Sequence, residues 1–176
     1  KPGRRSIRLP AYDYTRLGSY FVTICARDGE CLFGKIIKNR MALSEMGQIV
    51  ADCWLQIPAH FPHVELDVFV VMPNHVHGIL MIVRATHASP LPQTKTSSLR
   101  PCGPRKGSLG AIVGSFKSAV TRHINQSRNT SGNSVWQRNY YERVVRDEDE
   151  LNRIREYIQN NPLKWEEDEY YPVGAG

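Results

Sequence analysis

The stretch "VELDVFVVMPNHVHGILMIV", residues 64–83, predicts two adjacent β-strands and decides the fold class. Apolar and β-branched residues fill both halves, and Pro73-Asn74 between them favours a turn. A link this short joins antiparallel strands. His75 and His77 interrupt the second half, and a buried imidazole needs hydrogen-bond partners. We therefore expect a hairpin that carries two histidines at one end.

Further strands and helices are predicted on both sides of this hairpin. Three helices are predicted, and their expected N-caps are Ser44, Ser108 and Asp147. In the last helix, Asp147 and Glu150 form an aspartate-led capping box, and Pro162 ends the helix. Further strands are expected at "SYFVTICA" (19–26), "CLFGKII" (31–37), near Met41, and at "VWQRNYYERVV" (135–145).

Strands and helices therefore interleave along the chain, and the links between neighbouring strands are short. This pattern predicts an α+β fold with a ferredoxin-like or RRM-like antiparallel sheet, helices packed mainly on one face, and a C-terminal helix. We expect one domain, residues 1–176, with a basic arm at 1–18 and a flexible loop at 85–107. No apolar run reaches the roughly 18 residues of a membrane span.

The charge of the chain is divided unevenly. The formal net charge is +6, yet residues 147–176 hold three basic and nine acidic side chains, a net of −6. The remaining residues therefore hold 20 basic and eight acidic side chains, a net of +12. Such an excess suits a polyanion such as nucleic acid, although a basic soluble surface explains it equally well. The four cysteines form no Cys-x-x-Cys pair, which favours a reduced, cytoplasmic compartment.

His75 and His77 are expected to point to the same face of their strand, because alternate residues of a strand share a face. Two such imidazoles can share a metal ion if a third ligand arrives from elsewhere. Exposed rings bonded to water or backbone remain an equal alternative. In the last helix, Tyr157 and Asn161 are four residues apart and share one flank. They could equally be a half-buried aromatic residue and a helix cap.

The chain resembles the HUH single-tyrosine transposases, and is most similar to their REP-associated tyrosine transposases. The matching pieces fall in order from about residue 4 to residue 165. They are "YFVTICARDGECLFG", "MPNHVHGILMI", "SLGAIVGSFKSAVTRHIN", "VWQRNYYERVVR" and "REYIQNNPLKW". A lone His-x-His motif is a weak signal, but an ordered set that spans nearly the whole chain is a strong one.

The resemblance implies the roles of the site residues. His75 and His77 would be metal ligands, Tyr157 the nucleophile, and Asn161 a further metal ligand, directly or through water. Magnesium or manganese is the implied metal, since phosphate oxygens prefer hard cations. Gln137 could brace the metal shell or touch DNA. The cations expected to contact phosphates are Arg4, Arg5, Arg8, Lys106, Lys117, Arg122 and Arg138.

The implied activity is a metal-dependent DNA transposase or endonuclease, which nicks and rejoins single-stranded DNA near hairpins through a 5′-phosphotyrosine intermediate. A replication or mobilisation nickase would use the same chemistry. The alternative from another class is a non-catalytic single-stranded nucleic-acid-binding domain with an RRM-like sheet, in which Tyr157 is structural. The expected partner is single-stranded DNA with hairpin elements, in a bacterial, nucleoid-associated, cytoplasmic setting without a membrane. Both a monomer and a homodimer remain open.

Overall fold

The computed structural model describes residues 13, 15–83 and 104–172. The elements run in the order β1 (Gly18–Cys25), the 3₁₀ turn η1 (Arg27–Gly29), β2 (Gly34–Ile37), β3 (Arg40–Leu43), α1 (Glu45–Leu55), α2 (Ile57–His60), β4 (Val64–Val71), β5 (His75–Ile82), α3 (Leu109–Ser127), β6 (Tyr141–Val144), α4 (Glu148–Asn160) and the 3₁₀ segment η2 (Asn161–Glu167).

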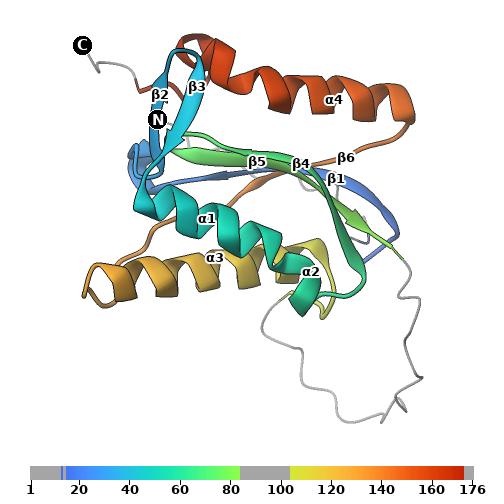
Figure 1. Cartoon of the computed structure of the whole chain (residues 1–176). Coiled ribbons are helices and arrows are strands. Elements are labelled where there is room, and N and C mark those ends of the chain that lie inside the picture. The colour runs from blue at the N-terminus through green and yellow to red at the C-terminus, as the bar shows by residue number, and fades with distance from the viewer. Residues whose placement is uncertain (1–12, 14, 84–103, 173–176) are drawn as a thin grey trace, which may run out of the picture.

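Four strands form one antiparallel sheet in the spatial order β4-β5-β1-β6, and β2 pairs with β3 in a separate hairpin. Apart from that hairpin, the strands and first helices follow the order β-α-β-β-α-β (Figure 1). This is the ferredoxin-like arrangement, so the predicted fold class is confirmed. The predicted hairpin of residues 64–83 is present as β4, at one edge of the sheet, and β5, in its interior.

The alternation of side chains along the strands divides the core into two layers. Val22, Val76 and Leu80 pack with α1 and α3 on one face. Phe21 and Ile79 pack with α4 on the opposite face. Figure 1 shows the same division, with α4 on one side of the sheet and α1 and α3 on the other. The histidines of β5 alternate with Val76 and therefore lie on the α4 side.

All three predicted helix N-caps are confirmed. The side chains of Ser44, Ser108 and Asp147 accept hydrogen bonds from backbone N–H groups three residues later, at 3.1, 3.3 and 2.7 Å. The carboxylate of Glu150 accepts a further bond from the backbone N–H of Arg146 at 2.8 Å. The first turn of α4 is thus fixed from both sides of its cap.

A bulge in β4 connects the sheet to α4. The register between β4 and β5 shifts between Leu66 and Phe69. Val68 then packs in the α4 layer, and Asp67 accepts hydrogen bonds from Arg155 of α4 at 3.0 and 2.6 Å. A bulge adds one unpaired residue and redirects the neighbouring side chains. It therefore lets two successive residues of β4 hold the helix that carries Tyr157.

Two strand predictions are too long. Residues 31–33 precede β2, and of residues 135–145 only Tyr141–Val144 form a strand, while Trp136 makes a single bridge with Ala26. The physical reason lies on α3, where the ammonium group of Lys117 donates to the carbonyls of Gln137 and Arg138 at 2.6 and 3.0 Å. These carbonyls bond to a side chain instead of a neighbouring strand. Among the described residues, no helix has the length and apolar character needed to cross a membrane.

Candidate active site

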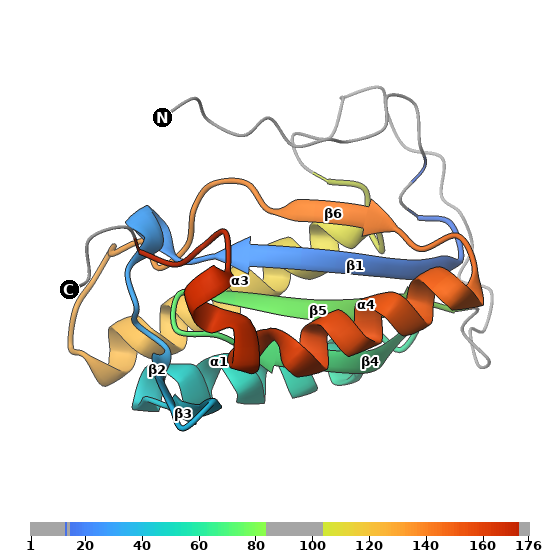
Figure 2. The same cartoon turned by 90° about the horizontal axis from the view of Figure 1, so that it is seen from above.

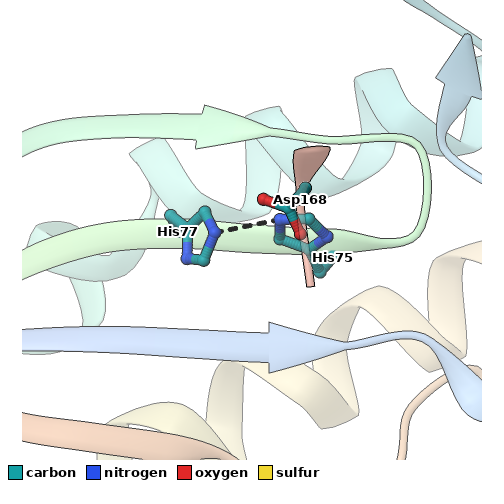
Figure 3. A group of neighbouring side chains, drawn as sticks. All are labelled: His75, His77 and Asp168. Atoms are coloured by element: carbon teal, nitrogen blue, oxygen red, sulfur yellow. Dashed lines mark hydrogen bonds between the residues drawn. The ribbon is translucent and has the colours of Figure 1, made fainter. Parts of the chain in front are cut away.

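The two histidines of β5 face each other at close range. The Nε2 atoms of His75 and His77 are 3.0 Å apart, and both rings are buried (Figure 3). Burial lowers the pKa of His75 to about 3. Burial also lowers the pKa of His77, with a further contribution from His75. Both imidazoles are therefore neutral at neutral pH, which is the form that binds a metal ion.

The outer nitrogen of each ring has a hydrogen-bond partner. Nδ1 of His75 donates to Oδ1 of Asn74 at 2.8 Å, because the Asn74 amide nitrogen is already directed at the carbonyls of Gly29 and Tyr170. Nδ1 of His77 lies 2.8 Å from the hydroxyl of Thr23, its cross-strand neighbour. Such partners orient the rings of metal ligands. A hydroxyl both donates and accepts, so Thr23 suits either tautomer of His77.

The close pair of nitrogens fits a shared cation. Because Nδ1 of His75 donates to Asn74, Nε2 of His75 is an acceptor, and it lies 3.0 Å from Nε2 of His77. When His77 also carries its proton on Nδ1, both rings present a lone pair to the same point, as two ligands of one metal ion do.

Tyr157 points from α4 toward the same nitrogen. Its hydroxyl lies 3.2 Å from Nε2 of His77, and its side chain is 45% exposed. Burial raises the pKa of Tyr157 to about 12, and the carboxylates of Asp168 and Glu169 raise it further. An interaction with Asn161 lowers this pKa, but by less. The phenol is therefore neutral at neutral pH but reaches both the imidazole pair and solvent.

Asn161 is buried beside the site, and its amide has one unused atom. Nδ2 donates to Oδ2 of Asp168 at 3.0 Å, whereas the buried Oδ1 has no hydrogen-bond partner among the described residues. A buried acceptor without a partner is costly, and a cation would satisfy it. Asn161 keeps helical geometry although a proline follows it. Asn161 has φ −58° and ψ −41°, because Pro162 falls in the first turn of η2, where its missing N–H costs nothing.

Asp168 is the site residue that sequence reasoning missed. Its carboxylate and the two histidines offer ligand atoms that all lie within 4.8 Å of one another (Figure 3). η2 brings the chain back over β5, where the ring of Tyr170 lies 4.7 Å from that of His75. Asp168 stands in an acidic run with no helical or strand spacing, so no pattern in the sequence distinguishes it from its neighbours. Thr23 was missed because only the register of β1 and β5 reveals it.

Comparisons with known proteins place the chain. A family model described as "Transposase IS200 like" matches residues 103–161, which include Tyr157 and Asn161. An uncharacterized protein of Haemophilus influenzae is 47% identical over 174 residues, which cover 96% of this chain and 93% of that protein. A putative REP-associated tyrosine transposase of the same organism is 24% identical over 155 residues, covering 86% and 74%. Over residues 103–161 the chain is similar to the IS200-like transposases.

A solved structure has a similar fold. The structure of a REP-associated tyrosine transposase bound to a REP hairpin superposes with a TM-score of 0.59 at 17% identity, and the match covers 88% of this chain and 72% of that one. At this identity the likeness concerns the fold alone. His75 and His77 lie before the segment that the family model matches, so their roles remain predictions.

The residues expected to contact DNA lie in different parts of the molecule. Arg4, Arg5 and Arg8 fall outside the described residues, as does most of the loop expected at 85–107. Lys106, Arg122 and Arg138 are exposed. Lys117 instead binds the carbonyls of residues 137 and 138. Gln137 has an exposed side chain. Its backbone N–H donates to the carbonyl of Cys25, the residue of β1 that pairs with His75 of β5.

Proposed function

We propose that the protein is a transposase that cleaves and rejoins single-stranded DNA through a covalent link to Tyr157. The observation that carries the proposal is the 3.2 Å approach of the Tyr157 hydroxyl to Nε2 of His77, beside the second imidazole of His75. A nucleophile within hydrogen-bond reach of groups that can bind a metal ion is the arrangement expected of such chemistry.

The chemical step conserves the phosphodiester bond energy. The phenolic oxygen of Tyr157 bonds to phosphorus while the bond from phosphorus to the 3′ oxygen breaks. The phenol loses its proton and the departing 3′ oxygen gains one, which gives a 5′-phosphotyrosine and a free 3′-hydroxyl. Attack by a 3′-hydroxyl on the phosphotyrosine reverses the step and releases the tyrosine. Nothing is consumed, so the reaction needs no nucleoside triphosphate.

His75 and His77 would hold a divalent cation. Oδ1 of Asn161 and the carboxylate of Asp168 are the nearby oxygen atoms that could serve as further ligands. When bound, magnesium or manganese supplies Lewis-acid activation of a phosphate oxygen and favours the phenolate form of the nucleophile. The chain itself fixes both rings through Asn74 and Thr23. Without the cation, the phenol of Tyr157 stays protonated, since burial and nearby carboxylates raise its pKa.

The proposed substrate is single-stranded DNA beside a hairpin. The related REP-associated transposase was solved with a REP hairpin bound, and the exposed cations Lys106, Arg122 and Arg138 suit a phosphate backbone. Because free duplex ends and single strands also carry phosphates, the hairpin preference is tested directly, by competition between a hairpin with a single-stranded flank and the same flank alone.

The decisive experiment is the capture of the covalent product. The protein is incubated with end-labelled hairpin DNA and manganese, denatured, and run on a denaturing gel. We expect a labelled adduct that Tyr157→Phe abolishes while DNA binding stays within about twofold. Tyr140→Phe is the matched control, because Tyr140 packs against the layer of α1 and α3 on the far face. DNA binding without any adduct would favour the non-catalytic nucleic-acid-binding domain instead.

A further inference from the structure

A row of three side chains crosses the sheet from the candidate active site to its edge. Thr23 of β1 pairs with His77 of β5 on one side and with Tyr141 of β6 on the other. Residues paired across antiparallel strands point to the same face, so all three lie on the side of α4. With neighbouring strands about 4.8 Å apart, the backbone of Tyr141 lies about 10 Å from that of His77.

Phe21 connects Tyr141 to the proposed nucleophile. Its buried ring meets Tyr157 edge-on with centroids 6.1 Å apart, and meets Tyr141 edge-on at 6.2 Å. Tyr141 is half-buried and Tyr157 is 45% exposed, so each presents part of its ring to solvent. Two partly exposed tyrosines therefore flank one buried phenylalanine, which holds them at a fixed separation.

α4 leaves this part of the sheet uncovered. Figure 2 shows the helix lying above β5 and β4, while β6 runs beside it at the edge of the sheet. Tyr141 thus stands between the flank of α4 and the sheet edge. Because it lies on a strand, its position is set more firmly than that of a loop residue.

Cations line the same side. Arg153 is exposed and precedes Tyr157 by four residues, so it lies one turn away on the same flank of α4. Arg143 shares the face of Tyr141 and pairs with Glu150 of α4. The strip formed by Phe21, Tyr141, Tyr157 and Arg153 therefore places aromatic rings beside an exposed cation, and these are features of a surface that binds single-stranded nucleic acid.

We propose that Tyr141 and Arg153 form a subsite for a nucleotide that flanks the scissile phosphate: its base stacks on Tyr141 and a backbone phosphate pairs with Arg153. The inference rests on the proposed function, because that function puts the scissile phosphate at His77. The occupant is an unpaired strand, since a base can reach the ring of Tyr141 only when it is not stacked in a duplex. The row from His77 to Tyr141 sets the path that the strand follows.

The stacking contact is tested by binding in the presence of a chelator, so that no cleavage occurs. Fluorescence anisotropy reports the affinity for a labelled hairpin with a single-stranded flank. We expect Tyr141→Leu, which keeps apolar contact with Phe21, to weaken binding roughly 5- to 100-fold. Tyr141→Trp should keep the affinity. The melting temperature of each variant shows that the fold is intact.

An abasic substitution, moved one position at a time along the flank, identifies the stacked base. At one position the abasic DNA should bind wild type and Tyr141→Leu equally, because the base that Tyr141 contacts is already missing. If Tyr141→Leu is without effect, or its effect is the same at every abasic position, the stacking proposal is overturned.

The phosphate contact has its own control. Arg153→Gln should reduce the slope of log affinity against log salt by about 1, as expected for one lost phosphate contact. Arg128→Gln removes an exposed arginine at the C-cap of α3, in the layer on the other face of the sheet, and should leave the slope closer to wild type. Equal slopes for Arg153→Gln and wild type would remove Arg153 from the subsite.

The subsite and the proposed chemistry fail in different ways. An adduct that forms on Tyr157 together with unchanged affinity in Tyr141→Leu overturns the subsite alone. Position-dependent weakening in Tyr141→Leu without any adduct in wild type supports base stacking and overturns the proposed cleavage.

Discussion

Tyr157 and His77 are 80 positions apart in the chain, yet the tyrosine hydroxyl lies 3.2 Å from Nε2 of the histidine. Two independent contacts produce this approach. Phe21 packs against both rings, stacked on His77 at 5.5 Å and edge-on to Tyr157 at 6.1 Å. Arg155 of α4 bonds to Asp67 in the bulge of β4. The proposed nucleophile is thus positioned by an aromatic contact on one flank of its helix and by an ion pair on the other.

Thr23→Val should weaken metal binding without unfolding the protein. The substitution keeps the shape of the side chain but removes the hydroxyl that lies 2.8 Å from Nδ1 of His77. Loss of such a partner typically costs 10- to 100-fold in metal affinity. Calorimetric titration with manganese measures the change. Thr121→Val, on α3 in the other layer, is the matched control, and an equal loss in both variants would contradict the role of Thr23.

Asp168→Asn should lower the pKa of Tyr157 from its value of about 12. Burial is the largest cause of the raised pKa and remains, but the negative charge of Asp168, the next cause, is removed. The difference in phenolate absorbance between each protein and its Tyr157→Phe counterpart, followed against pH without metal, isolates this residue. Asp149→Asn, at the far end of α4, should leave the titration unchanged. A pKa that stays the same in Asp168→Asn would show that the carboxylate does not act on the phenol.

The fold was predictable because its determinants are local. Alternating apolar residues, three N-caps and the turn at Pro73-Asn74 each act within a few residues, and all of them reappear in the structure. The paired direction of His75 and His77 follows from the same strand period. The lost strand at 135–140 was not predictable, because it depends on Lys117 from a distant helix.

The partners of the site were harder to predict, because they depend on long-range geometry. Thr23 meets His77 through the register of two strands, and a shift of one residue would turn Thr23 to the other face. Asp168 reaches the histidines through the path of η2, which no sequence period encodes. Helical spacing did relate Tyr157 to Asn161. Neither spacing nor composition distinguishes Asp168 from its acidic neighbours.

Asp67→Asn should destabilise the protein by about 2 kcal/mol at pH 7, the scale of hydrogen bonds to a charged group. Although desolvation raises the pKa of Asp67, the hydrogen bond from Arg155, the Val68 N–H and the charge of Arg155 outweigh it, so the pKa is lowered. A lowered pKa in the folded state stabilises the fold above the unfolded value of about 3.9. That contribution is lost as the pH falls through the folded pKa.

Urea unfolding of Asp67→Asn and wild type at several pH values measures this effect. The difference in free energy of unfolding should be constant near neutrality and shrink below about pH 4, where the carboxyl becomes protonated. Asp52→Asn, whose partner Gln48 is an exposed neighbour on α1, serves as the control with a small effect. A difference that stays constant down to pH 2 would contradict the ion pair as its source.

Gly78→Ala should destabilise the fold by about 3 kcal/mol, the upper range for added volume in a packed core. Gly78 lies between His77 and Ile79, and a methyl group there would lie 2.8 Å from Cη2 of Trp54 and 3.1 Å from Cβ of Phe69. The indole is fully buried, so it can move only if the core around it moves as well. Displacing it would also shift β5, so metal affinity should fall together with stability.

Gly114→Ala provides the opposite expectation for the same chemical change. A Cβ at Gly114, on the exposed side of α3, would meet no atom within 4 Å among the described residues, and alanine is favoured over glycine in a helix by about 1 kcal/mol. Thermal unfolding should therefore show a lower melting temperature for Gly78→Ala and a higher one for Gly114→Ala. Equal shifts in both variants would mean that the approach of Trp54 to β5 is not as close as the structure has it.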